Sequence, residues 1–124
     1  MVTFKSVAPS FVVADVVATA EYYRDVLGFE ILGYFGEPIV FAMVARGGVE
    51  LHFGKADAEP QRTNLELRKI SSDAYIWITD VEALFQELTA SGADIIAGPI
   101  RQVYDCIELE VRDCNGFKLV FSQG

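Results

Sequence analysis

The chain has 124 residues, enough for one globular domain with a hydrophobic core that needs no disulfide or metal cross-links. Hydrophobic residues make up 52% of it and charged residues 23%, which argues against long disordered segments. The formal net charge is −8, and it disfavours nucleic-acid binding, because affinity for phosphates comes from Lys and Arg. An acidic protein favours a cationic partner instead.

The stretch "VAPSFVVADVVATAE" near the start is similar to a secretory signal peptide, with Ala18-Thr19-Ala20 as a small-residue cleavage site. Asp15 interrupts its apolar run, so we expect no cleavage. No stretch approaches the length of a membrane span. Two cysteines are too few for a disulfide framework. We therefore expect a cytoplasmic protein with its full chain retained and with no membrane or nucleic-acid partner.

Two segments about half the chain apart follow one pattern, "FVVADVVATAEYYRDVLGFEIL" (11–32) and "IWITDVEALFQELTASGADIIA" (76–97). Each begins with a strand-like apolar run and continues with Asp-Val and a helical segment. Asp15 and Asp80 are expected to cap the helix N-termini. Gly28 and Gly92 are expected to end the helices in the left-handed conformation. The repeat indicates two copies of one structural module.

Each copy continues with a hairpin, "IVFAMVARGGVELHFG" (39–54) and "YDCIELEVRDCNGFKLVFSQG" (104–124). We therefore expect an α+β fold, with two tandem βαβββ modules that form a curved mixed sheet around a cleft and helices on the outer face. It would be a single domain over 1–124, with module one at 4–54, a linker at 55–72 and module two at 73–123. The "LEL" of the linker either pairs locally or forms a turn of helix.

The strands alternate between apolar and polar residues, which indicates a sheet with one buried face. In "IELEVR" (107–112), Glu108 and Glu110 alternate with apolar residues, and in "VELHF" (49–53) Glu50 and His52 do the same. We expect the polar faces to form the wetter wall of a cleft.

The stretches "VADV", "EYYRDVLGFE" and "ELEVRDCNGFKLVF" resemble the vicinal oxygen chelate superfamily, which includes glyoxalases, extradiol dioxygenases and bleomycin-resistance proteins. The resemblance covers essentially the whole chain, and it identifies a fold rather than an activity. Two positions depart from the family pattern. Cys114 stands where members usually have Pro, and Asp105 follows Tyr104 where Gly is common.

In metal-bearing members, the resemblance implies four ligand positions, which here fall on Ala8, Glu50, Ala74 and Val120. Alanine and valine have no lone pair to donate. Glu50 and His52 supply two donors, and the third of a non-standard site would have to come from Glu108, Glu110 or Asp73. We therefore expect no metal and no cofactor.

What remains resembles the metal-free bleomycin-resistance branch, which sequesters a cationic glycopeptide drug in clefts of a homodimer. The resemblance implies an antibiotic-resistance role, in which a homodimer binds a cationic or aromatic small molecule. We expect no catalytic residues. The expected ligand-binding residues are Glu50, His52, Glu108, Glu110, Phe41 and Tyr104, with Tyr34 and Phe35 beside them.

Two other functions stay open. A lyase or isomerase of glyoxalase type would use Glu50 and His52 as an acid–base pair or in a non-standard metal site. An interaction or regulatory module would keep only a vestigial cleft. The sequence does not identify the ligand, because the loops at 33–38 and 55–72 set the volume of the cleft.

Overall fold

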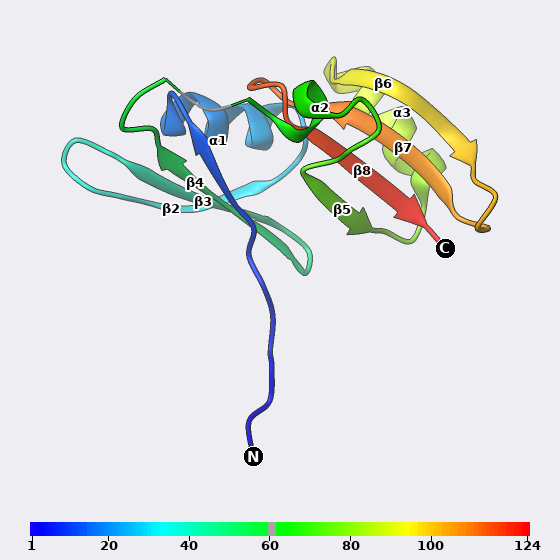
Figure 1. The fold of residues 1–124 in the computed structure, drawn as a ribbon, viewed down its shortest axis with the longest axis horizontal. Coiled ribbons are helices and arrows are strands. Elements are labelled where there is room, and N and C mark those ends of the chain that lie inside the picture. The colour runs from blue at the N-terminus through cyan, green and yellow to red at the C-terminus, as the bar shows by residue number, and fades with distance from the viewer. Residues whose placement is uncertain (60–61) are drawn as a thin grey trace. The chain divides into compact units, whose positions relative to one another are not determined.

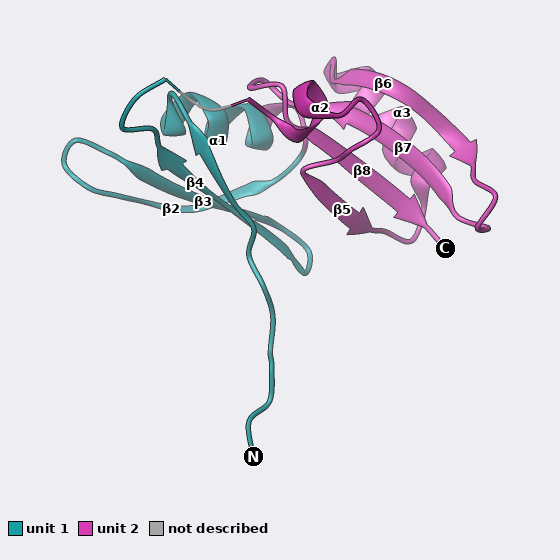
Figure 2. Ribbon diagram, viewed as in Figure 1, with its two compact units in different colours: residues 1–24, 28–60 teal, residues 25–27, 61–124 magenta. Residues whose placement is uncertain are grey.

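The computed structural model describes residues 1–59 and 62–124. The chain forms two compact units, Met1–Arg24 with Gly28–Pro60 and Asp25–Leu27 with Gln61–Gly124 (Figure 2). Each unit contains one four-stranded mixed sheet. The fold is α+β with two tandem modules, as the sequence repeat predicts.

The first unit contains β1 (Ser10–Val13), most of α1 (Val16–Asp25), β2 (Glu30–Phe35), β3 (Phe41–Arg46) and β4 (Val49–Lys55). Its strand order is β1-β4-β3-β2, in which β1 is parallel to β4 and the other pairs are antiparallel. Residues 1–9 form an extended segment before β1 (Figure 1).

The second unit contains α2 (Asn64–Leu67), β5 (Ala74–Trp77), α3 (Val81–Ser91), β6 (Asp94–Arg101), β7 (Ile107–Arg112) and β8 (Lys118–Gln123). The strand order is β5-β8-β7-β6, and β5 is parallel to β8. This is the order of the first sheet repeated, so both modules have βαβββ topology.

The helix boundaries confirm the predicted capping residues. Asp15 Oδ1 accepts a hydrogen bond from the Ala18 amide at 3.0 Å, and Asp80 Oδ1 accepts one from the Ala83 amide at 3.0 Å. Gly28 and Gly92 follow the helices with φ of 76° and 85°, where a Cβ would strain the backbone.

Each sheet has one apolar face that packs against its helix. In the second unit, Leu109 and Val111 of β7 are fully buried, and α3 contacts β6, β7 and β8. In the first unit, the ring of Tyr23 from α1 lies 4.9 Å from that of Phe53 on β4, between centroids. The predicted alternation of apolar and polar residues is confirmed. In each sheet, the polar residues of β4 or β7 lie on the face away from the helix.

The linker residues "LEL" form the helical turn α2. The Thr63 side chain accepts a hydrogen bond from the Glu66 amide at 3.2 Å, and the Glu66 side chain accepts one from the Thr63 amide, which makes a capping box. Positions 60 and 61 of the linker lie outside the described residues. Among the helices described, none has the length and hydropathy required to cross a membrane.

Candidate functional site

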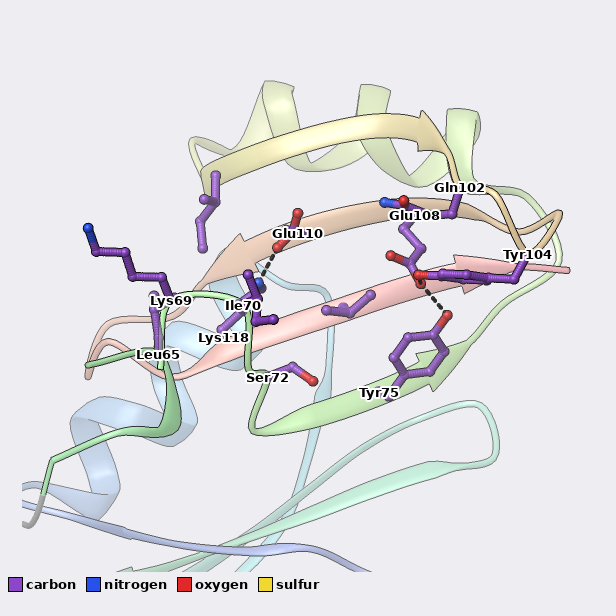
Figure 3. Close-up of a pocket in the computed structure, with 12 residues that line it drawn as sticks. Leu65, Lys69, Ile70, Ser72, Tyr75, Gln102, Tyr104, Glu108, Glu110 and Lys118 are labelled. Carbon is purple, nitrogen blue, oxygen red and sulfur yellow. Dashed lines mark hydrogen bonds and ion pairs between the residues drawn. The ribbon is translucent and has the colours of Figure 1, made fainter. Parts of the chain in front are cut away.

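A pocket of about 530 Å³ opens on the polar face of the second unit's sheet (Figure 3). Strands β5, β7 and β8 form its floor, and the segment around α2 and the loop after β6 form its walls. Its volume falls in the range of small-molecule sites. The polar lining includes Tyr75, Tyr104, Glu108, Glu110 and Lys118, and the apolar lining is Leu65, Ile70, Ile96 and Val120.

Glu108 is the centre of a hydrogen-bonded cluster in this pocket. The hydroxyl of Tyr75 donates to Glu108 Oε2, and the hydroxyl of Tyr104 donates to the same oxygen at 2.6 Å. Figure 3 shows the two phenol rings reaching this carboxylate from different sides. Glu108 is 7% exposed, so the sheet holds a carboxylate largely removed from water.

The carboxylate changes the acidity of both phenols. The hydrogen bond to Glu108 raises the pKa of Tyr104 to about 12, and burial adds to this effect. Burial raises the pKa of Tyr75, and the hydrogen bond to Glu108 is the next cause. Ser122 lowers the pKa of Tyr75, although the buried Ser122 hydroxyl forms no hydrogen bond of regular geometry. At neutral pH both tyrosines are therefore protonated donors and poor general acids.

Glu110 has a different environment on the same face of β7. The Lys118 ammonium forms an ion pair with Glu110 Oε1, and Lys118 is only 5% exposed. The charge of Glu110 is therefore neutralised inside the protein. Glu108 and Glu110 share one face, as predicted, but they do not offer the same field to a ligand.

The other three predicted site residues gather in the first unit. His52 Nε2 lies 2.5 Å from Glu50 Oε2, and the Phe41 ring packs edge-on against the imidazole with centroids 5.3 Å apart. The structure therefore divides the expected residues into two groups, one in each unit. Over residues 1–59 and 62–124, no three His, Cys, Asp or Glu side chains form a cluster suited to a metal ion.

The register of β5 corrects one expectation. Ala74 was expected to face the cleft, but Ala74 and Ile76 are 8% and 7% exposed on the core side, whereas Tyr75 lines the pocket. Val120 lines the pocket of the second unit, and Ala8 lies in the extended segment before β1. None of these alanine and valine side chains can donate to a metal, so this donor set does not fit the metal site of metal-bearing relatives.

Tyr75 and Lys118 line the pocket but were not predicted as site residues from the sequence. Trp77 is the only tryptophan of the chain, and its ring centroid lies 4.9 Å from that of Tyr75. The signal was present in "AYIW", where an aromatic residue alternates with a small or aliphatic one, the pattern of a strand with one buried face. Tyr34 and Phe35 are exposed on β2, where they are 39% and 71% accessible.

The family model described as Glyoxalase/Bleomycin resistance protein/Dioxygenase superfamily matches residues 4–121. The chain belongs to this superfamily. A comparison of the chain with curated protein sequences finds no match.

Solved structures share the superfamily fold over nearly the whole chain. The bleomycin-binding protein of Streptomyces verticillus, complexed with copper(II)-bleomycin, is 26% identical with a TM-score of 0.74, and the match covers 100% of this chain and 99% of that one. TioX from Micromonospora sp. ML1 is 19% identical with a TM-score of 0.76, covering 97% and 98%. A bleomycin-binding protein complexed with bleomycin is also 19% identical with a TM-score of 0.76, covering 98% and 99%.

Proposed function

We propose that this protein binds and sequesters a cationic or aromatic small molecule of antibiotic type, without a metal and without chemical turnover. The pocket of the second unit is the proposed binding site. Glu50, His52 and Phe41 of the first unit are proposed as further ligand contacts. The proposed setting is the cytoplasm.

The observation that carries the proposal is Glu108, a buried carboxylate in a pocket of about 530 Å³ that accepts hydrogen bonds from two neutral phenols. A carboxylate that is largely buried from water favours a cationic guest, because water screens its charge poorly. The raised pKa values of Tyr75 and Tyr104 keep both phenols as fixed donors, which suits binding better than proton transfer.

The similar structures support the same class of ligand. Two of them are bleomycin-binding proteins that were solved with bleomycin or copper(II)-bleomycin. Bleomycin is therefore a suitable first probe, together with a panel of other cationic antibiotics.

The test is thermal unfolding in the presence of a metal chelator. A ligand that binds only the native state stabilises it by about 2.7 kcal/mol at a concentration of 100 Kd, so the melting temperature should rise with ligand concentration. Mass spectrometry should recover the ligand chemically unchanged. A panel that leaves the melting temperature unmoved, or a ligand that is consumed, contradicts the proposal.

A second candidate function is acid–base chemistry of lyase or isomerase type in the first unit. The 2.5 Å contact between His52 Nε2 and Glu50 Oε2 favours it, because a carboxylate in contact with an imidazole can orient it for proton transfer. Turnover of a glyoxalase-type substrate that His52→Ala abolishes would support this candidate. Turnover that is unchanged in His52→Ala excludes it.

We also propose that the protein is a homodimer. The extended segment at residues 1–9 carries Val2, Phe4 and Val7, which are 82%, 95% and 83% exposed. Exposed apolar side chains on an extended segment favour cover by another chain.

A further inference from the structure

Resting on the proposed function, we propose that Glu108 Oε1 accepts a hydrogen bond from the amidinium, guanidinium or ammonium group of a ligand that carries this group on a flat aromatic ring. The contact would give the pocket its selectivity for a cation over a neutral molecule of the same shape. Glu110, on the same face, would have no part in this selectivity.

The two oxygens of Glu108 are used differently. Tyr75 and Tyr104 both donate to Oε2, and no donor in the described part of the chain reaches Oε1. A carboxylate oxygen accepts more than one hydrogen bond, so Oε1 retains its full capacity. Among the described residues, Oε1 is not one of the buried atoms without a partner, so it is accessible from the pocket and a ligand donor can reach it.

The charge of Glu108 also lacks a cation. Among residues 1–59 and 62–124, no lysine or arginine nitrogen lies within ion-pair distance of its carboxylate. The pocket lysines do not supply one, because Lys118 is paired with Glu110 and Lys69 points away from Glu108 (Figure 3). An uncompensated buried charge is unfavourable, so a cationic ligand group would relieve it.

A second unsatisfied group lies at the same end of the pocket. Ser122 is directly opposite Glu108 in the β7–β8 register, and residues two apart on a strand share a face, so Ser122 is on the side of Val120. Ser122 is fully buried, and its hydroxyl has no hydrogen bond of regular geometry. A buried hydroxyl without a hydrogen bond partner therefore adjoins Glu108 beneath the pocket lining, although Ser122 itself does not line the pocket.

The surroundings favour an aromatic carrier for the cation. Tyr75 presents its ring beside that of Trp77, with centroids 4.9 Å apart. Aromatic faces attract cations and pack against other rings. The remaining floor and wall at Val120, Ile70 and Ile96 are apolar, which suits the body of such a ligand.

The experiment uses the full chain with benzamidine, which is a cation at neutral pH, and with benzamide, its neutral isostere. Trp77 is the only tryptophan, so its fluorescence reports binding beside Tyr75. We expect benzamidinium to bind at least tenfold more tightly than benzamide. Glu108→Gln should remove this preference by lowering the affinity for benzamidinium. The control Glu30→Gln makes the same charge change at an exposed glutamate of β2 and should keep the preference.

Equal affinity of the wild-type protein for the two probes overturns the inference, and this comparison needs no variant. An affinity for benzamidinium that changes less than twofold in Glu108→Gln also overturns it. The proposed function fails separately. If bleomycin and the antibiotic panel bind and Glu108→Gln binds them equally well, the function stands and the inference fails. If none of them binds but benzamidinium does, the function fails and the inference stands.

Discussion

The Tyr75 hydroxyl donates a hydrogen bond to Glu108 Oε2 across β8, the strand that lies between their own strands. In the sheet register, Val120 is opposite Tyr75 and Ser122 is opposite Glu108. The contact therefore links β5 and β7, which share no backbone hydrogen bonds, and it fixes the position of the acid on the pocket floor. Tyr104 reaches the same oxygen from the loop after β6.

Glu108→Gln should lower the pKa of Tyr104 from about 12 toward its ordinary value of 10, because the hydrogen bond to a charged carboxylate is the largest cause of the shift. The protonated phenol stabilises the folded state fully below pH 10. That contribution is lost as the pH rises from 10 through about 12, because the folded state then holds a proton that the unfolded state has released.

The measurement is the near-ultraviolet absorbance of phenolate as a function of pH, with circular dichroism to confirm that the protein is folded at each point. Tyr104→Phe identifies the late-titrating group, and Glu50→Gln is the charge-matched control. Identical titration curves for the wild-type protein and Glu108→Gln would show that the carboxylate does not hold this proton.

Lys118→Met should lower the free energy of unfolding by about 1–3 kcal/mol, because Glu110 then keeps a charge without a cation. The Glu110 side chain is 21% exposed, so water screens part of this loss. The double variant with Glu110→Gln should be more stable than Lys118→Met alone, since no uncompensated charge is left. Urea unfolding of the wild-type protein, Lys118→Met, Glu110→Gln and the double variant measures these differences.

The control for this pair is Arg112, whose contact with Asp94 is 3.9 Å and lies between exposed side chains. Arg112→Met should cost less than about 1 kcal/mol, the usual range of surface ion pairs. If the double variant loses as much as the sum of its two single changes, Lys118 and Glu110 act independently and the ion pair contributes nothing.

Gly98→Ala should destabilise the second unit. Gly98 has φ of 96°, and a Cβ there would overlap the carbonyl oxygen of Glu108 on β7. The backbone conformation alone costs about 1–3 kcal/mol for a residue other than glycine. Gly48→Ala is the control, because its Cβ would enter open space, and it should change stability by less than about 0.5 kcal/mol. Equal losses in the free energy of unfolding for both variants, measured by urea unfolding, would contradict the close approach of Gly98 on β6 to the backbone of β7.

Features that depend on a few neighbouring residues were predicted correctly from the sequence. The capping contact of Asp80 involves a residue three positions away, and the stop at Gly92 needs only a glycine after an apolar helix. Strand alternation is equally local, and it placed Glu108 and Glu110 on one face. A repeat of such local patterns was enough to give the topology of both modules.

The details of the pocket depend on contacts between distant residues, and these were not predictable. Tyr75 and Glu108 meet only because β5 and β7 both pair with β8. Lys118 neutralises Glu110 as a diagonal neighbour across the hairpin, although its direct partner is Arg112. The family resemblance implied a ligand position at Ala74, facing the cleft, and a shift of one residue along a strand reverses the face.

The extended segment before β1 provides the test of the proposed dimer. Phe4 and Val7 are 95% and 83% exposed there, and β1 is an edge strand of its sheet. If these side chains pack against a second copy, sedimentation should give about twice the 13.7 kDa of one chain. The double variant Phe4→Ser and Val7→Ser should shift the protein toward the monomer, because it removes about 2–4 kcal/mol of apolar burial. Lys5→Ser alters the same segment without removing an apolar group, so it should leave the dimer intact. A wild-type protein that sediments as a monomer at micromolar concentration, or a dimer that tolerates both serines, would mean that another surface, or none, joins two chains.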